Sequence, residues 1–307
     1  MRKLSGQFMR DLVDSKGVLQ PILTRVKVDS TLMLAIRENY INIYYRGGNI
    51  LKIKEHNKSN YQASFDKQYN KSGLLIPDSP TEISNQNDSR SWVDSLPIRK
   101  NIMDEYFSTQ AKAEREFQQL IARENNNSAI SNESEYFITD IEVAEPNARF
   151  DIMAIRWLAA QRKNGSDCKA ALIEMKYGDK ALAGSTGLIK HLRDMEKLVS
   201  NQESYVRLLE TMESQFNQLD ELGLLKFNKS VSDAKVKLNP DEKPEVIFIL
   251  ANHNPRSTKL GTILSDPEID LFAQSKLFDL NFFVASFAGY GLHSKCMLPL
   301  VEFRKLL

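Results

Sequence analysis

The chain has 307 residues, of which 42% are hydrophobic and 26% are charged, and its formal net charge is +1. This balance is typical of an ordinary soluble globular protein, long enough for one large domain or two smaller ones. A net charge near zero excludes a global basic field, so any affinity for nucleic acid must come from a local patch or a bound metal.

The sequence predicts neither export nor a membrane segment. The start of the chain, Met1 to Gln7, lacks an apolar signal core, and the longest apolar stretch, residues 246–251, is far too short to span a bilayer. Cys168 and Cys296 are the two cysteines, too few for a disulfide framework or a zinc ribbon. We therefore expect a cytoplasmic protein with no membrane partner.

The first hundred residues predict a small β-rich module. Strand-like runs cover residues 32–36, 41–45, 50–53 and 61–65. Gly47 and Gly48 lie between the second and third runs, and a Gly-Gly pair there is a hairpin signal. From Asp66 to about Arg99 the chain is rich in Ser, Asn, Asp, Gln and Pro, the composition of a linker. The module with its linker is predicted to cover residues 1–99.

Residues 100–307 predict a second domain. A long helix over about residues 100–124 precedes three strands, and the turn at residues 145–147 is short enough for an antiparallel hairpin between the first two. Two helices, a buried strand, a helix and a last buried strand follow. The predicted strands are 136–144, 149–158, 169–177, 245–251 and 281–287, and the predicted helices after the third strand are 187–200, 203–222 and 266–278. This order is typical of a mixed α/β sheet.

Three charged residues in this domain lie in runs that read as buried strands. Asp151 lies in the run 150–155, and Glu174 and Lys176 end the run 170–176. Because strand side chains alternate between faces, Glu174 and Lys176 project from the same side. Charge beside apolar neighbours is costly unless a cation binds it. The pattern therefore indicates a site that holds a divalent metal and cuts a phosphodiester.

The residue types fit that chemistry. Phosphodiester cleavage needs a nucleophile in line with the leaving group and a Lewis acid that neutralises the developing charge. Magnesium takes oxygen ligands and keeps several waters, so Asp151, Glu174 and the backbone carbonyl of Met175 would suffice to hold it, with Mn²⁺ as a substitute. Lys176 could orient or deprotonate the attacking water, or offset charge on the phosphate. The sequence leaves these roles of the lysine open.

A further acidic ligand is expected from the preceding helix. Glu114 shares a helical face with Phe107, Phe117 and Ile121, whereas Glu116 points to the flank. An acid on the core-facing side is harder to explain as a solvated charge. We therefore favour Glu114 as the additional metal ligand, and Glu116 is the alternative.

Asp151, the triplet Glu174-Met175-Lys176 and the strand order resemble the PD-(D/E)XK nuclease superfamily, which includes restriction endonucleases and archaeal Holliday-junction resolvases. The run Glu114-Arg115-Glu116 is similar to the opening acidic helix of the resolvases, in which the first glutamate is the metal-associated one. The resemblance covers about residues 105 to 200 and implies a restriction-endonuclease-like αβββαβ core, magnesium and DNA as substrate. Phe150 stands where the superfamily often has proline.

The resemblance also implies which residues contact DNA. In the superfamily the helix after the lysine strand often carries a polar residue that faces the site, and His191 is the best positional match here. Lys190 and Arg193 on that helix, with Lys180 in the loop before it, could meet phosphates. RNA stays open as a substrate, and cutting both strands with one site per chain would favour a homodimer.

Three other interpretations compete with a nuclease. Glu174 and Lys176 could pair in water on an edge strand while Asp151 caps a turn. The chain could be a nucleic-acid- or partner-binding protein that has the fold without the activity. It could also be a metal-dependent enzyme that acts on another phosphate or on a sugar. Because Asp151, Glu174 and Lys176 are all intact, we favour a DNA endonuclease of restriction, repair or recombination.

Overall fold

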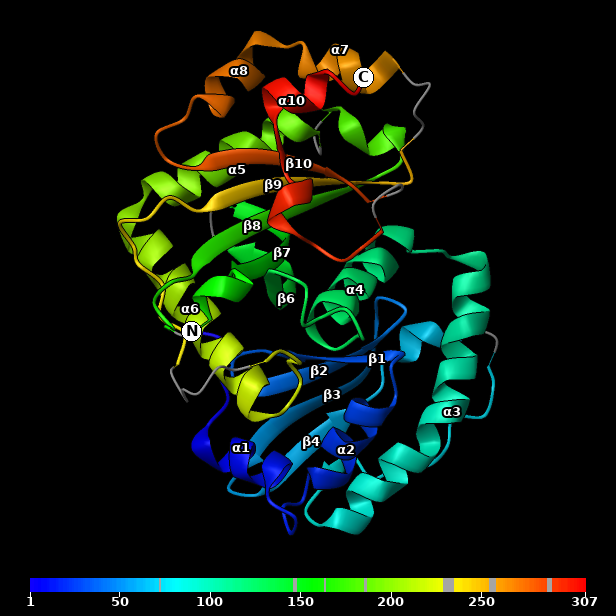
Figure 1. Cartoon of the computed structure of the whole chain (residues 1–307). Coiled ribbons are helices and arrows are strands. Elements are labelled where there is room, and N and C mark those ends of the chain that lie inside the picture. Colours follow the sequence, from blue (N-terminus) through cyan, green and yellow to red (C-terminus); the bar gives the residue numbers. More distant parts are fainter. Residues whose placement is uncertain are drawn as a thin grey trace. The chain divides into compact units, whose positions relative to one another are not determined.

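A computed structural model describes residues 1–71, 73–145, 148–162, 164–184, 187–228, 235–253, 258–285 and 289–307 (Figure 1). Its contacts divide the chain into two compact units. The first unit is Met1–Gln119 with Gln218–Leu224, and the second is Leu120–Asn217 with Leu225–Leu307. Both units contain a β-sheet with helices, so the chain is of the mixed α/β class. The predicted boundary near residue 100 falls inside a helix of the first unit.

The first unit is built on an antiparallel sheet whose strands follow one another in chain order, β1-β2-β3-β4-β5. The strands are β1 (Leu32–Ile36), β2 (Tyr40–Tyr45), β3 (Gly48–Asn57), β4 (Asn60–Ser64) and β5 (Glu82–Ile83), and the main helices are α1 (Gly6–Val13), α2 (Gln20–Val28) and α3 (Gln86–Thr109). The first four strands confirm the predicted β-rich module. Helices α1 and α2 lie in a segment for which the sequence pattern predicted no element.

The predicted Gly-Gly hairpin joins β2 and β3. Arg46 and Gly47 form its turn, with φ of 48° and 72°, the left-handed backbone that a two-residue hairpin turn requires. Gly48 begins β3 and is needed for a different reason. A Cβ atom at this position would lie 2.6 Å from Met103 Cε and 2.8 Å from Phe107 Cζ, so any other residue here would force these side chains of α3 to shift.

The helix predicted over residues 100–124 is wrong, because the chain forms two helices there. Helix α3 begins at Gln86, inside the segment predicted as a linker, and α4 (Ala113–Asn126) follows it. The start of α3 is fixed by a capping box in which the Asn85 side chain accepts from the backbone of Asp88 and the Asp88 side chain accepts from the backbone of Asn85. Gln110 leaves the helical conformation, with φ −132° and ψ 59°, and ends α3.

The two ends of the first unit meet through the side chain of Gln218. Its Oε1 accepts from the backbone N–H of Leu4, and its Nε2 donates to the backbone carbonyl of the same residue, both at 2.9 Å. Gln218 lies near the end of α6 (Gln202–Glu221), a helix that begins in the second unit. The first unit is therefore discontinuous in sequence.

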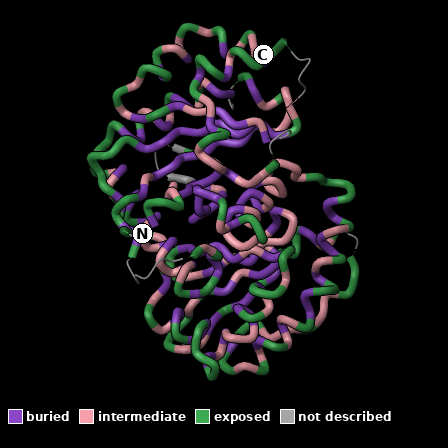
Figure 2. The backbone as a smooth tube through the Cα atoms, viewed as in Figure 1, coloured by how far each residue is buried: buried purple, intermediate pink, exposed green. Residues whose placement is uncertain are grey.

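The second unit contains a mixed sheet in the order β11-β10-β9-β8-β7-β6. Strands β6, β7 and β8 are antiparallel neighbours, β9 and β10 run parallel to β8, and β11 is antiparallel to β10. The strands are β6 (Tyr136–Glu145), β7 (Ala148–Arg156), β8 (Lys169–Tyr177), β9 (Glu245–Ala251), β10 (Asp279–Val284) and β11 (Leu298–Pro299). Every residue of β9 is buried, so the core of this unit follows the middle of the sheet (Figure 2).

The helices of the second unit include α5 (Leu188–Ser200), α6, α7 (Thr258–Leu264), α8 (Pro267–Ala273) and α10 (Leu300–Arg304). Three of them, α5, α6 and α8, match the predicted ones in order, and α7 and α10 were not predicted. The helix predicted over 266–278 is shorter than expected, because it ends at Ala273 and β10 begins at Asp279. Within the predicted turn at 145–147, residues 146 and 147 lie outside the described part, as does the end of the last predicted strand. Among the described residues, no helix is long and apolar enough to cross a membrane.

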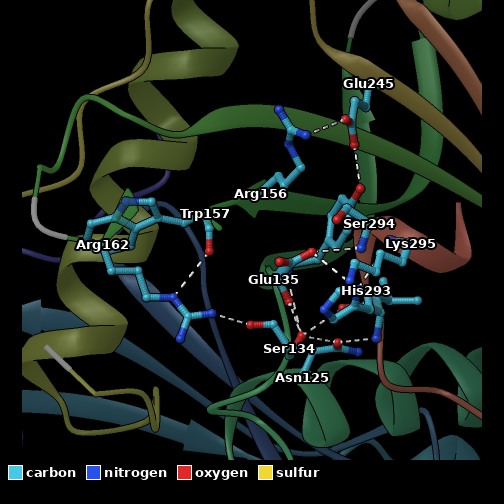
Figure 3. Close-up of polar contacts among 12 residues, drawn as sticks. Asn125, Ser134, Glu135, Arg156, Trp157, Arg162, Glu245, His293, Ser294 and Lys295 are labelled. Carbon is cyan, nitrogen blue, oxygen red and sulfur yellow. Dashed lines mark hydrogen bonds and ion pairs between the residues drawn. The ribbon is translucent and has the colours of Figure 1, made fainter. Parts of the chain in front are cut away.

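A polar network supports the sheet at the end where β9 begins (Figure 3). The Tyr136 hydroxyl donates to Glu245 Oε2 at 2.7 Å, and Arg156 Nη1 lies 3.3 Å from the other oxygen of Glu245. Nearby, the buried Arg162 guanidinium donates to the backbone carbonyls of Asn132, Ser134 and Trp157. These contacts hold the segments that flank β6 and β7, so they are structural.

The two cysteines should differ sharply in reactivity. Cys168 is buried, its thiol donates to the carbonyl of Gly165 at 3.2 Å, and burial raises its pKa to about 12, whereas Cys296 is exposed. Because the thiolate is the reactive form, a thiol reagent at pH 8 should label Cys296 in the native protein and Cys168 only after unfolding. Mass spectrometry of native Cys296→Ser should find no label. Full labelling of that folded variant would contradict the packing around Cys168.

Candidate active site

The candidate site lies where β7 and β8 part. The two strands pair from Arg156↔Lys169 to Ile152↔Ile173, and the ladder ends there. Beyond the last pair, Asp151 Oδ2 accepts from the backbone N–H of Met175 at 2.8 Å. The Asp151 carboxylate thus accepts the bond that a backbone carbonyl of β7 would accept in a continued ladder, and this bond fixes it against β8. Strand β8 continues in register with β9 as far as Tyr177↔Ala251.

The strand register brings the three predicted residues to one face of the sheet. Met153 pairs with Leu172, and residues directly opposite in an antiparallel pair point to the same face. Asp151 is two residues from Met153, and Glu174 and Lys176 are two and four residues from Leu172. Alternation therefore places all three charges on this face, with Asp151 one register position beyond the last pair and opposite Glu174.

Glu174 and Lys176 form a buried ion pair. Lys176 Nζ lies 2.6 Å from Glu174 Oε1, and the two side chains are only 4% and 3% exposed. Strand β8 lies between β7 and β9, so the interpretation as an edge strand with a pair in water is wrong. Removing two ions from water costs several kcal/mol each, and apolar residues of similar volume often serve stability as well or better. The pair therefore calls for an explanation other than stability.

His191 joins the pair from helix α5. Its Nε2 lies 3.0 Å from Glu174 Oε1, and it shares the buried face of α5 with Leu188, Met195 and Leu198. Burial, together with the nearby Lys176 ammonium, lowers the pKa of the imidazole to about 4. At neutral pH the ring is therefore neutral, and it contacts the carboxylate without adding a second positive charge to the pair.

The predicted helix acids lie in the other unit. Glu114 and Glu116 are on the first turn of α4, in the part of that helix that belongs to the first unit. Glu116 is engaged there, because its Oε1 accepts from Arg46 Nε at 2.9 Å. Within the second unit, the site thus consists of Asp151, Glu174, Lys176 and His191. A metal-binding role of Glu114 stays a prediction.

The predicted basic contacts differ in their surroundings. Lys190 forms an ion pair with Asp194 one turn along α5. Arg193 forms a two-pronged pair with Glu268 at the start of α8, with both distances 2.6 Å. Lys180 is exposed on the short 3₁₀ turn η3 (Asp179–Leu182) after β8. Contact of these side chains with DNA stays a prediction.

Two acids that the sequence analysis did not single out lie on β6 beside the site. Asp140 pairs in register with Met153, is 2% exposed and accepts from Gln215 Nε2 at 2.9 Å. Glu142 lies between the pairs Ile141↔Ile152 and Val143↔Phe150, next to Asp151, with a left-handed φ of 54°. In the sequence, Asp140 and Glu142 alternate with apolar residues. This strand-like pattern is a signal that could have identified Asp140. Nothing in the pattern indicates the left-handed backbone at Glu142.

A histidine–carboxylate pair lies where the parallel strands β8 and β9 end. His253 Nδ1 lies 3.0 Å from Asp179 Oδ1, and the histidine side chain is 6% exposed. The backbone N–H of Gly178 donates to the carbonyl of Ala251, which keeps the two strand ends adjacent. Asp179 lies two residues after β8, which carries the site, and His253 lies two residues after β9, which flanks it. The sequence showed His253 after a buried strand, but its partner is evident only from the fold.

The donor set of the site fits a hard divalent cation that keeps much of its water shell. Across the described residues, no three His, Cys, Asp or Glu side chains lie together in a way that could hold a metal. Asp151 and Glu174 provide two carboxylates at facing positions, and the carbonyl of Met175 lies between Glu174 and Lys176 in sequence. Magnesium is commonly held by one or two carboxylates plus waters. A zinc site, with its four nitrogen or sulfur ligands, does not fit.

Comparison of the chain with protein-family models, with curated proteins and with solved structures found no match.

Replacing Lys176 by Met should destabilise the second unit by about 3–5 kcal/mol, because Glu174 would remain buried without its cation. The double variant Glu174→Gln/Lys176→Met should recover much of that loss. Urea unfolding in a Trp92→Phe background measures this, since Trp157 then reports on the second unit alone.

The exposed pair Glu302–Lys305, 2.7 Å apart in the same unit, is the matched control. Lys305→Met should change the unfolding free energy by less than about 1 kcal/mol. Equal stability of wild type and Lys176→Met would contradict the buried pair.

His191 should make stability depend on pH. Its pKa of about 4 in the folded chain lies below the unfolded value of 6.5. The stability that the neutral ring contributes is therefore present above pH 6.5 and lost as the pH falls towards 4. His191→Gln should lack this component, so its unfolding free energy should fall less than that of wild type between pH 7 and pH 5. An equal fall in both proteins would show that another group titrates.

Proposed function

We propose that the second unit is a magnesium-dependent nuclease that hydrolyses phosphodiester bonds of DNA. The observation that carries the proposal is the gathering of Asp151, Glu174 and Lys176 on one face of the sheet, where β7 and β8 separate. Two carboxylates and an ammonium at the centre of an apolar sheet lower the stability of the fold. A bound metal would use both carboxylates as ligands, and a phosphate would be a counter-charge for the ammonium. RNA as a substrate is not separated from DNA by these residues.

The order of elements supports the same proposal. A helix precedes three antiparallel strands, helices cross over, and the next strand joins parallel to the third. The αβββαβ core of the restriction-endonuclease-like fold has this order. In this chain, Asp151 lies on the second of the three antiparallel strands, and Glu174 and Lys176 lie on the third. We propose that the second unit has this core.

The proposal gives each residue of the site a role. Asp151, Glu174 and the carbonyl of Met175 would hold Mg²⁺, which supplies Lewis acidity and a water of lowered pKa when bound. The N–H of Met175 orients Asp151, as outer partners of metal ligands commonly do, and the neutral ring of His191 contacts Glu174 Oε1 at 3.0 Å. The Lys176 ammonium is available to position the attacking water or to offset charge on the phosphate.

DNA contact would come from a local basic edge rather than from the whole chain, whose net charge is +1. Lys180 is exposed and could meet a phosphate directly. Lys190 and Arg193 would exchange their partners Asp194 and Glu268 for phosphate oxygens. Such exchange costs little on the surface, because exposed ion pairs contribute about 1 kcal/mol or less.

A non-catalytic nucleic-acid- or partner-binding protein of the same fold is the second candidate. It is favoured by the state of Glu174, whose Oε1 already contacts both Lys176 Nζ and His191 Nε2. A carboxylate with both contacts is held without a metal. Cleavage assays separate the two candidates.

Supercoiled plasmid, linear duplex, single-stranded DNA and RNA should be incubated with the protein in Mg²⁺, Mn²⁺ or EDTA. We expect DNA cleavage with Mg²⁺ or Mn²⁺, and a loss of roughly 100-fold or more in Asp151→Asn, Glu174→Gln and Lys176→Met. Glu302→Gln and Lys305→Met alter an exposed pair of the same unit and should cleave like wild type.

Cleavage that persists in the three site variants would contradict the proposal that these residues form the nuclease site. Metal-independent gel shifts without cleavage would select the binding protein. Isothermal titration with Mn²⁺ gives a readout besides activity, and Asp151→Asn should weaken that binding.

A further inference from the structure

The first unit contains a cavity of about 350 Å³ between the end of β4, the segment 76–81 and helix α3. Its apolar walls include Phe65, Ile76 and Trp92, and Arg99 lines it from α3. The volume lies within the range of roughly 300–1,000 Å³ that is common for small-molecule sites. Since all lining residues belong to the first unit, the cavity is independent of the candidate nuclease site.

Arg99 is the buried charge of this cavity. Its residue is 3% exposed, and its guanidinium lies over the ring of Trp92 at 4.3 Å and over that of Phe65 at 5.1 Å. The Nε donates to Ser95 Oγ, and Nη2 donates to the Pro77 carbonyl and to Ser79 Oγ. Three of the five N–H groups of arginine are thus used. Within the described part of the chain, the remaining pair on Nη1 has no hydrogen-bond partner.

Arg162 in the second unit shows how this chain satisfies a buried arginine for structure alone (Figure 3). All three of its guanidinium nitrogens donate to backbone carbonyls. Burial lowers the pKa of Arg162, and the carboxylates of Glu135 and Glu133 oppose that effect. Burial also lowers the pKa of Arg99, to about 10, and among the described residues no carboxylate forms an ion pair with it. The charge of Arg99 is therefore offset by aromatic rings and neutral acceptors, and its Nη1 group keeps two unused N–H donors.

The remaining polar groups of the cavity are arranged for an anion. Lys67 and Asp78 line it from exposed positions and offset each other, so the positive charge of the lining is that of Arg99. The hydroxyls of Ser64, Ser79 and Thr81 add donors. A buried cation without a counter-charge is costly, and a bound anion would remove that cost.

We propose that this cavity binds the phosphoryl group of a small phosphorylated molecule, with the Nη1 group of Arg99 as its principal contact. A tetrahedral phosphate has enough acceptor oxygens for two N–H groups, the Lys67 ammonium and neighbouring hydroxyls, whereas a carboxylate has fewer. The cavity walls of Phe65, Ile76 and Pro77 would contact the remainder of the molecule. The single net positive charge favours one anionic group over a nucleic-acid backbone.

Isothermal titration of the full chain with inorganic phosphate and with adenosine 5′-monophosphate tests the proposal. We expect one site per chain, with no binding of adenosine or succinate at the same concentrations. Arg99→Gln should weaken binding roughly tenfold or more, because it removes a charged hydrogen-bond donor. Lys67→Gln should weaken it a few-fold, and Lys58→Gln, an exposed lysine outside the cavity, should leave it unchanged.

The proposal is overturned if neither phosphate probe binds at millimolar concentration, or if binding survives in Arg99→Gln. Equal binding of succinate would contradict a site for a phosphoryl group and indicate a carboxylate site instead. Displacement of the probe by a DNA oligonucleotide would contradict a small-molecule site and indicate a nucleic-acid site. Circular dichroism establishes that Arg99→Gln is folded. Should it not fold, Lys67→Gln and Ser79→Ala decide instead, since both retain the guanidinium.

Discussion

The ion pair between Lys176 and Glu174 is the constraint on which the second unit depends. Strand β8 is the centre of the sheet, and a carboxylate and an ammonium there must be satisfied by each other or by neighbours. A neighbouring element contributes a further contact. Helix α5 packs against β7 and brings the ring of His191 to Glu174 Oε1, the oxygen that Lys176 also contacts. The buried pair thus lowers stability locally, and the burial of apolar strands such as β9 compensates for that loss.

The separation of β7 from β8 gives that place its geometry. A continued ladder would use the backbone of Met175 for pairing, and the side chain of Asp151 takes its N–H instead. The strand end therefore holds a carboxylate at a position fixed by backbone rather than by a flexible side-chain partner. Sites built on regular elements are held more precisely than sites on loops, which is the property that phosphoryl chemistry needs. The proposed nuclease activity rests on this arrangement, and the proposed phosphate cavity of the first unit does not.

Much of the sheet could be predicted from the sequence, because buried strands are short apolar runs that differ from everything around them. The extent of β8 and β9 matches the predicted runs residue for residue. The start of α3 could not be found by composition, since its first turns are rich in Ser, Asn and Asp. The capping box that begins it depends on the side chains of Asn85 and Asp88 rather than on hydrophobic spacing. Within the site, alternation correctly put Glu174 and Lys176 on one face. The partners of His253 and Arg99 depend on segments distant in sequence, and a pattern within one segment carries no information about them.

The contact between Leu4 and Gln218 has a consequence for biosynthesis. The first unit includes Gln218–Leu224, so its last piece emerges from the ribosome only after strands β6 to β8 have been made. An N-terminal fragment would leave the backbone groups of Leu4 without the amide that caps them. Bringing Leu4 and Gln218 together closes a long loop of chain. The entropic cost of closing a loop grows only slowly with its length, but a long loop delays completion of the first unit. The N-terminal unit of this chain is thus completed late, against the usual order in which domains fold as they are synthesised.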